Sequence, residues 1–319
     1  MEGQDFLTEY RNISNKLKKR FLRRPNVAEA SDHFRQLAKK LEDNDDPQFA
    51  GFCYLATGRC EQTVGNSSAE VEAITLAARC FLRCELEQQN LKNPSYEEHL
   101  NAAIAGFKEA GKLEEEAGRG SAAAALYIEL GDTLVSLQRS AEALFHYDKA
   151  LELETSSIID TLAIKTKISN CYISLGDHHN ALKTLTELAN FCAANDPCHL
   201  YQSQLANIEV LRVLLLLIIQ PSHHNTAPHL LQVLDKYKWD GMEGEEEVEL
   251  CPYLDTDISI LLQSIVMVVQ VRDSEALLYL EDEIAEYLNP QQKALLSEPR
   301  SKTKIRKQES FKYSFYGEK

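Results

Sequence analysis

The stretch from residue 122 to residue 191 constrains the fold of this chain most, because two copies of one helical pattern follow each other there. Residues of similar type recur at spacings of three and four, the period of one face of an α-helix. The recurring positions are Tyr127, Leu130, Gly131, Leu134, Ala143, Tyr147 and Ala150 in the first copy, and Ile168, Tyr172, Gly176, Ala181, Leu185 and Leu188 in the second. Small residues at such positions let two antiparallel helices approach closely, and the aromatic residues fill the space between successive pairs.

This combination is typical of tetratricopeptide (TPR) repeats, although the unit here is longer than the usual ~34 residues and neither copy keeps the full pattern. A similar spacing of Ala103, Phe107 and Ala110 indicates that the repeats begin well before residue 122. The sequence therefore predicts an all-α fold. We expect a TPR-like α-solenoid of about 13–14 antiparallel helices, forming one elongated domain over residues 1–298.

Sequence signals also predict where several helices begin. We expect the first helix to span Asp5 to Leu22, with Pro25 ending its extension. Further starts are expected at Asn26 with Glu29, which has the form of a capping box, at Asp46-Pro47, at Ser67 with Glu70, and at Asn93-Pro94.

Composition supports a helical protein and excludes several classes of function. The 319 residues include 13 Gly and 9 Pro, so the residues that form β-turns are scarce. A formal net charge of −15 argues against a nucleic-acid binder, which needs a positive surface for phosphates. The eight cysteines fall mostly on apolar helix faces and no secretory signal precedes them, so we expect reduced thiols in a cytoplasmic protein.

The helix that ends at Pro221 is apolar around its whole circumference. Its most apolar run, Val210–Ile219, is interrupted by Arg212 and is shorter than the ~20 residues that cross a bilayer, so we expect no transmembrane segment. Two interpretations stay open: a core helix that other helices cover, or a helix whose second face meets another protein. The candidate contact residues for the second interpretation are Leu214, Leu217 and Ile218.

An acidic segment at about residues 240–257 is a second candidate for partner contacts. It is a solvated loop by default, or an electrostatic docking site for a basic surface. The acidic residues assigned to such a site are Glu245, Glu246, Glu247, Glu249, Asp255, Asp257, Asp273 and Glu275. By contrast, residues 299–319 form a basic and aromatic tail that we expect to be disordered when free.

The sequence offers little support for catalysis, and we predict a non-enzymatic protein with no cofactor and no metal. The adjacent histidines at 178–179 and 223–224 lack the i, i+4 spacing that places two imidazoles on one helix face. No phosphate-binding glycine loop and no nucleophile elbow occurs. A clamp for chaperone-tail carboxylates is also disfavoured, because Glu129 and Asp132 stand where such a clamp needs cations or amides.

Several blocks of the chain resemble one family closely. They are SNKLKKRFLRRPNVAEA at Ser14–Ala30, EVLRVLLLLIIQP at Glu209–Pro221, LDKYKW at Leu234–Trp239, and LLQSIVM followed by DSEAL within 261–277. These are not general TPR positions, and they keep the same order at both ends of the chain. The chain from Asp5 to the last helix pair therefore resembles the family of forty-kilodalton huntingtin-associated proteins, also called factor VIII intron 22 proteins.

The resemblance implies a TPR-like solenoid that binds huntingtin in a one-to-one complex, between the large HEAT-repeat domains of that protein. It also implies a cytoplasmic protein associated with early endosomes, where an active Rab GTPase recruits the complex, with the nucleus as a second compartment. Two departures limit what the resemblance carries over. Vertebrate members have a Gly/Ala-rich leader and a long Pro-rich insertion before the apolar helix, and here only Ala193 to Tyr201 stand in the place of the insertion. The basic and aromatic tail after Glu298 is the second departure, because it is particular to this sequence.

An alternative is a vesicle-trafficking adaptor similar to soluble NSF attachment proteins, whose helical arrays grip SNARE bundles. Such a protein would use a basic concave face, whereas this chain is acidic overall and its positive charge gathers at the two ends.

Overall fold

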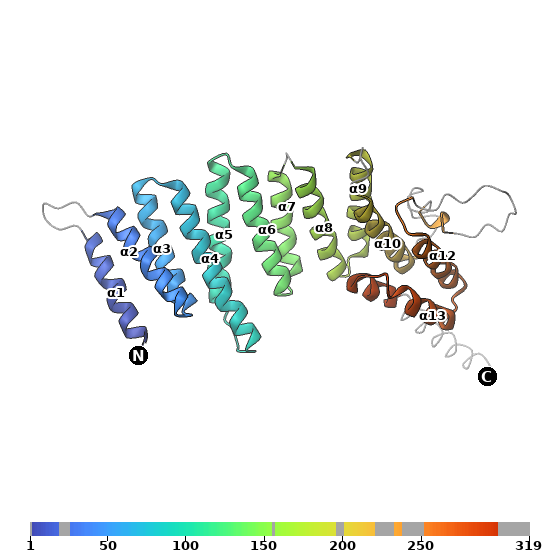
Figure 1. Ribbon diagram of the computed structural model, residues 1–319, viewed down its shortest axis with the longest axis horizontal. Coiled ribbons are helices and arrows are strands. Elements are labelled where there is room, and N and C mark those ends of the chain that lie inside the picture. The colour runs from blue at the N-terminus through green and yellow to red at the C-terminus, as the bar shows by residue number, and fades with distance from the viewer. Residues whose placement is uncertain are drawn as a thin grey trace, which may run out of the picture. The chain divides into compact units, whose positions relative to one another are not determined.

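A computed structural model describes residues 2–18, 26–154, 157–195, 201–220, 233–237 and 252–298. All regular structure within these ranges is α-helical. The helices between residues 2 and 153, and those between residues 178 and 284, pack against their described neighbours in chain order (Figure 1). This confirms the predicted all-α, TPR-like solenoid. The tail at 299–319 lies outside the described residues, and the assignment of residues 1–298 to one elongated domain stays a prediction.

The chain divides into two compact units, Met1–Ile164 and Lys165–Lys319, which we call the first unit and the second unit. The helices of the first unit are α1 (Glu2–Leu17), α2 (Val27–Asp43), α3 (Pro47–Val64), α4 (Ser67–Asn90), α5 (Glu98–Glu116), α6 (Gly120–Ser136) and α7 (Ser140–Leu153). The next helix, α8 (Ile158–Ser174), crosses the division between the units. The second unit continues with α9 (His178–Asn195), α10 (Gln202–Ile219), α12 (Thr256–Val271), α13 (Ser274–Ile284) and a helix at 290–298.

Glycines set how closely the helices of the first unit approach. A Cβ atom added at Gly131 on α6 would lie 2.5 Å from Cε1 of Tyr147 on α7. One added at Gly111 on α5 would lie 2.8 Å from Cζ of Tyr127 on α6. Carbon atoms cannot pack this closely, so each tyrosine ring occupies the space that a larger residue would fill. The small-residue and aromatic pattern of the sequence therefore corresponds to a direct ring-on-backbone contact.

Several acidic side chains of the first unit have partners inside the same unit. Asp132 accepts a hydrogen bond from the hydroxyl of Tyr147 at 2.7 Å. Glu129 on α6 accepts two hydrogen bonds from the guanidinium of Arg79 on α4, at 2.6 and 2.8 Å. Glu129 and Asp132 are the two acidic residues that disfavour a clamp for chaperone-tail carboxylates. In the structure both of them also connect neighbouring helices.

The observed ends of the helices can be compared with the starts, caps and ends that the sequence predicts. The capping box of α2 is confirmed, because Oδ1 of Asn26 accepts from the backbone N–H of Glu29 at 3.2 Å. Pro47 opens α3 as predicted. The first helix, α1, ends at Leu17, five residues before the predicted end, while residues 19–25 lie outside the described part of the chain.

The predicted start of α4 at Ser67 is confirmed, but the predicted cap is wrong by one residue, because the N-cap is Asn66, whose side chain accepts from the backbone N–H of Ala69 at 3.4 Å. The predicted start of the next helix is wrong. The helix predicted from residue 93 begins at Glu98, because Glu97 has a positive φ of 59° that no α-helix can include.

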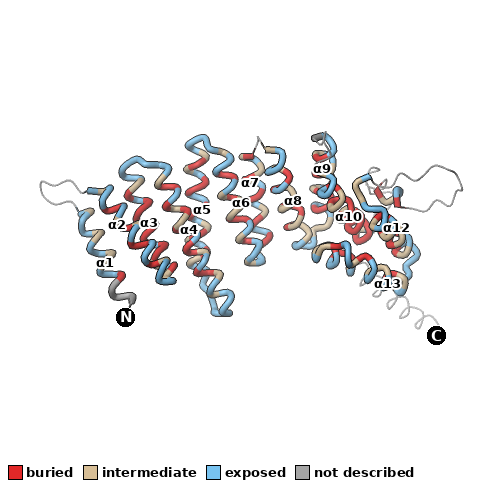
Figure 2. Tube along the Cα trace, viewed as in Figure 1, coloured by how far each residue is buried: buried red, intermediate tan, exposed pale blue. Residues whose placement is uncertain are grey.

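The interior helix of the second unit is α10. Residues 213–218 are each at most 4% exposed, so neighbouring segments cover this helix on all sides (Figure 2). Such all-round burial is what a helix without a polar face requires. Among the described helices, α10 is also the one with the length and composition to cross a membrane. Since 61% of it is buried inside the protein, and core helices meet the same criterion, this is weak evidence for a span.

The helix at 290–298 is joined to α10 by hydrogen bonds to the side-chain amide of Asn207. Oδ1 of Asn207 accepts hydrogen bonds from Nδ2 of Asn289 at 3.2 Å and from Nε2 of Gln292 at 2.7 Å. At the other end of this helix, Glu298 lies 3.2 Å from Nε2 of His178 at the start of α9. Residues more than eighty positions apart are therefore joined across the second unit.

Candidate partner-binding surface

Helices α12 and α13 form a hairpin with a tight, well-defined turn. Arg272 has a positive φ of 61°, which ends α12, and its backbone N–H donates to the carbonyl of Val269 at 3.2 Å. Asp273 then caps α13, because its Oδ1 accepts from the backbone N–H groups of Glu275 at 3.0 Å and Ala276 at 3.2 Å. A connection this short makes α13 run back along α12.

The hairpin exposes several large apolar side chains. One face of each helix is buried, with Ile265 and Ile284 at 0% exposure. Other positions are exposed, and the apolar residues among them and just after α13 are Ile260, Met267, Val271, Leu278, Tyr279 and Tyr287. Groups of exposed apolar residues are typical of interaction surfaces, which makes the hairpin a candidate surface.

A groove lies at the end of the hairpin where α12 begins, with a volume of about 650 Å³. Its lining residues, which we name the acidic groove, are Asp257, Ile260, Leu261, Asp282, Glu283, Glu286 and Tyr287. The four carboxylates are exposed, and none of them forms an ion pair within the described residues. They are also not arranged to hold a metal ion, since no metal-binding group of His, Cys, Asp or Glu is present in that part of the chain. The groove therefore suits a positively charged surface that brings apolar side chains with it.

The structure separates the acidic residues that the sequence assigns to one surface. Asp255 and Asp257 lie at the start of α12, on the side of the acidic groove. Asp273 and Glu275 lie at the turn, at the opposite end of a helix about 24 Å long. All four are exposed, and residues 245–249 lie outside the described ranges.

The apolar candidates on α10 are placed in the interior. Leu214 is 0% exposed, Leu217 is 4% exposed and Ile218 is 3% exposed. Their side chains are out of reach of a partner while the second unit keeps this packing, so the core-helix interpretation of the sequence describes their position. We do not include them in the candidate surface.

Sequence reasoning missed Asp282, Glu283 and Glu286. Only the antiparallel course of α13 brings these three residues beside Asp257, and no spacing in the sequence fixes that alignment. The available signal was composition, because basic residues are scarce between 252 and 298, where Arg272 and Lys293 stand alone among many acidic residues.

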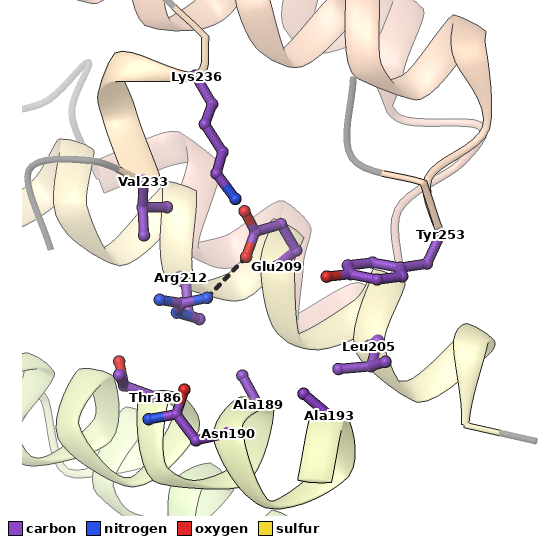
Figure 3. Close-up of a pocket in the computed structure, with 10 residues that line it drawn as sticks. All are labelled: Thr186, Ala189, Asn190, Ala193, Leu205, Glu209, Arg212, Val233, Lys236 and Tyr253. Carbon is purple, nitrogen blue, oxygen red and sulfur yellow. Dashed lines mark hydrogen bonds and ion pairs between the residues drawn. The ribbon is translucent and has the colours of Figure 1, made fainter. Parts of the chain in front are cut away.

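A second pocket, of about 400 Å³, is formed within the second unit (Figure 3). The residues that line it are Thr186, Ala189, Asn190, Ala193, Leu205, Glu209, Arg212, Val233, Lys236 and Tyr253. At its floor, Nη1 of Arg212 donates to Oε2 of Glu209 at 2.8 Å. In the sequence Arg212 interrupts an apolar run. Its i, i+3 spacing from Glu209 is the feature of the sequence that predicts an ion pair between the two residues.

The described cysteines have the character of packing residues. Cys53, Cys60, Cys80, Cys84, Cys171 and Cys192 are free and buried. Burial raises the pKa of the Cys53 thiol to about 12, with a smaller contribution from the charge of Glu9. A thiol with so high a pKa carries almost no nucleophilic thiolate at neutral pH. Cys198 and Cys251 lie outside the described residues.

An antiparallel helical solenoid with an exposed apolar and acidic hairpin defines a protein-interaction adaptor. Comparison with known proteins supports this class and makes it more specific. Residues 124–156, which cover most of α6 and α7, match the family model of the tetratricopeptide repeat. The 40-kDa huntingtin-associated proteins of Mus musculus and Rattus norvegicus are each 32% identical to this chain over 350 positions, covering 92% of this chain and 92% of each relative.

The chain belongs to the family of the 40-kDa huntingtin-associated protein. The aligned region of 350 positions is longer than the 319 residues of this chain, so the relatives carry residues that have no counterpart here.

Proposed function

We propose that this protein is a non-enzymatic scaffold subunit that binds huntingtin in a one-to-one complex and holds its HEAT-repeat domains together. The observation that carries the proposal is the 32% identity to two huntingtin-associated proteins over nearly the full length of both chains. An all-helical repeat fold supports it, because such folds offer long surfaces for other proteins. The same family membership supports recruitment of the complex to early endosomes by an active Rab GTPase.

We further propose that the acidic groove and the exposed apolar residues of the hairpin contact huntingtin. Apolar side chains at the centre of an interface contribute most of the affinity, whereas surrounding charges select the partner and speed association. Asp282 and Glu283, which form no ion pair within the described part of the chain, present negative charge that a basic surface of the partner would neutralise. The contact should therefore weaken as salt concentration rises.

Affinity purification of the full chain tests the proposed partner. We expect huntingtin to co-purify in equal molar amount, as measured by mass photometry of the eluted complex. Recovery of SNARE proteins with an AAA ATPase, and no huntingtin, would instead support the alternative adaptor. Endosome association is tested separately, by imaging the tagged chain before and after depletion of early-endosomal Rab GTPases; unchanged association would remove that part of the proposal.

Charge reversal tests the acidic groove. We expect Asp282→Lys, Glu283→Lys and Glu286→Lys together to weaken huntingtin binding about tenfold or more at low salt, with a smaller effect at high salt. A matched control reverses the exposed Asp32, Asp43 and Glu109 of the first unit, which changes the net charge by the same amount. Equal affinity of the two triple variants, measured by biolayer interferometry at low salt, would show that the groove has no specific role.

A further inference from the structure

The connection between α4 and α5, residues 91–97, projects from one edge of the first unit. Helix α4 has 24 residues, whereas the neighbouring helices α3 and α6 have 18 and 17. The connection lies beyond the α2–α3 and α6–α7 turns at the same edge (Figure 1). Every residue from 89 to 98 is exposed, so no other described element covers this part of the chain (Figure 2).

Tyr96 in this connection is the most exposed tyrosine among the described residues. It is 90% exposed, and its hydroxyl forms no hydrogen bond within the described part of the chain. Tyr54, Tyr127 and Tyr147 are instead buried, and each of their hydroxyls donates to a carboxylate. Packing and hydrogen bonding therefore account for those three tyrosines but not for Tyr96.

The main chain that leads to Tyr96 is non-helical and available for pairing. Residues 93–96 belong to no helix, and the backbone N–H groups of Ser95 and Tyr96 donate no hydrogen bond among the described residues. Pro94 keeps this stretch out of a helix, because proline disfavours helical geometry at the preceding residue and has no N–H of its own. The segment can therefore pair with the main chain of another protein.

The helix that follows Tyr96 begins without a side-chain cap. Glu97 is the N-cap residue of α5, and its side chain accepts from none of the first N–H groups of that helix. An N-cap hydrogen bond is typically worth about 1 kcal/mol, so the first turn of an uncapped helix opens at less cost. Glu98, the first residue of α5, is also exposed. The chain on both sides of Tyr96 can therefore become extended without disturbing the core.

These features fit the substrate of a protein tyrosine kinase. Such an enzyme has to place a hydroxyl in line with the γ-phosphate of ATP inside a cleft, which requires a projecting side chain on a segment that can leave its own fold. Glu97 and Glu98 follow Tyr96 directly, and they favour a kinase whose substrate cleft is basic. Glu97 also lies 3.1 Å from Nη1 of Arg139, whereas Glu98 forms no ion pair among the described residues.

We propose that Tyr96 is a phosphorylation site for a tyrosine kinase that selects acidic residues after the tyrosine. The phenolic oxygen attacks the γ-phosphorus of Mg-ATP, the bond from that phosphorus to the bridging oxygen of ADP breaks, and the phenolic proton passes to a carboxylate base of the kinase. Phosphorylation adds about two negative charges at a side chain that the fold does not use. It therefore changes what the first unit binds without changing how it folds, whether or not the partner is huntingtin.

Rates of phosphorylation in the folded chain and in peptides test the structural basis of the proposal. Tyr279 is the matched comparison, because it is 75% exposed but lies within α13 and cannot become extended unless that helix opens. The full chain, and synthetic peptides spanning 91–101 and 274–284, are incubated with the purified catalytic domain of a non-receptor tyrosine kinase and Mg-ATP. Initial rates at each tyrosine are measured by mass spectrometry. We expect the ratio of the Tyr96 rate to the Tyr279 rate to be about tenfold or more higher in the chain than in the peptides.

Variants of the full chain test the charge recognition and the structural independence of Tyr96. We expect Glu98→Lys to lower the initial rate at Tyr96 about fivefold or more. Glu109→Lys, at an exposed position further along α5, changes the net charge equally and should leave that rate unchanged. Tyr96→Phe should remove the phosphorylation at this position and keep the thermal midpoint of the wild-type chain.

Modification in the cell is tested by isolating the full chain from expressing cells treated with the phosphatase inhibitor pervanadate. We expect phosphate on Tyr96 and none on Tyr279. Three results would overturn the proposal. They are an equal ratio of rates in the chain and in the peptides, an undiminished rate at Tyr96 in Glu98→Lys, and the absence of phosphate on Tyr96 in treated cells whose other proteins carry phosphotyrosine.

Discussion

In the first unit Glu129 is held by two hydrogen bonds from Arg79, whereas in the second unit Asp282 and Glu283 stand exposed at the end of α13 without an ion pair among the described residues. Carboxylates of the same kind therefore have different surroundings in the two units. Glu129 joins two helices of its own unit, whereas Asp282 and Glu283 line the acidic groove. This contrast supports the proposal that the hairpin takes part in recognition, although the repeat pattern is clearest in the first unit.

Exposed apolar residues do not follow the same division. The hairpin exposes Tyr279 at 75% and Val271 at 78%, and the first unit exposes Tyr96 at 90% and Leu91 at 71%. What distinguishes the first unit is its close helix contacts, where glycines such as Gly131 lie directly against tyrosine rings. Three predictions test the contrast between an internally paired first unit and an available hairpin.

The largest effect is expected at His146, which is 4% exposed on α7 and stacks on Tyr127 with 6.2 Å between ring centroids. Burial, with a smaller contribution from the charge of Lys108, lowers the pKa of His146 from the usual 6.5 to about 4. Between these values the unfolded chain binds a proton that the folded chain does not, so stability is complete above pH 6.5 and falls as pH drops toward 4. Across that window this group should cost the first unit about 3 kcal/mol.

His146→Phe keeps an aromatic ring and removes the titration. Hydrogen exchange of the α6 and α7 amides at pH 7 and pH 5 measures the effect, after correction for the intrinsic pH dependence of exchange. We expect acid to destabilise these helices less in the variant, while α12 and α13 respond alike in both proteins. A wild-type first unit as acid-sensitive as the variant would mean that His146 is protonated in the folded state.

An intermediate effect is expected for Gly131→Ala, because the new methyl group would overlap the ring of Tyr147. Overpacking of this kind costs about 1–3 kcal/mol, which exceeds the gain in helix propensity of about 1 kcal/mol. In Gly58→Ala, the control, the nearest atom is Cγ1 of Ile74 at 3.2 Å, and the loss should be much smaller. Thermal unfolding followed by circular dichroism measures both variants, and equal midpoints would show that the close contact does not set the helix spacing.

The smallest effect compares one carboxylate from each unit. Glu129→Gln weakens the contact with Arg79, whose side chain is about half exposed, so the loss of stability should be about 0.5–1 kcal/mol. Glu283→Gln removes an exposed charge that has no ion pair among the described residues, and it should change stability by less than about 0.5 kcal/mol. Urea unfolding measures the free energy of unfolding of both variants. An equal loss of that free energy in the two variants would contradict the contrast between the two units.

The sequence was sufficient for the architecture because close helix packing needs small residues at fixed positions, and Gly131 is one of them. The sequence also included the interior position of α10 as one of two interpretations, because a helix that is apolar around its whole circumference has to be covered. It failed where local chemistry has several solutions, as at Glu97, whose positive φ delays the start of α5.

The sequence also failed where a site depends on how two helices align. Asp257 and Asp273 are close in the chain, and the patterning assigned them to one surface. The hairpin places them at opposite ends of α12 and brings Asp282 beside Asp257 instead. That outcome depends on the short turn at Arg272, whose positive φ no composition or charge pattern indicates.

The bonds from Asn207 to the C-terminal helix have a consequence for synthesis of the chain. Gln292 follows Asn207 by 85 residues, so at the usual speed of translation roughly 4–17 s pass before the bonding partner of Asn207 has been made. During this interval α10, whose residues 213–218 are all apolar, has been synthesised without the helix that covers it last. Exposure of these apolar residues therefore lasts until synthesis of the chain is nearly complete.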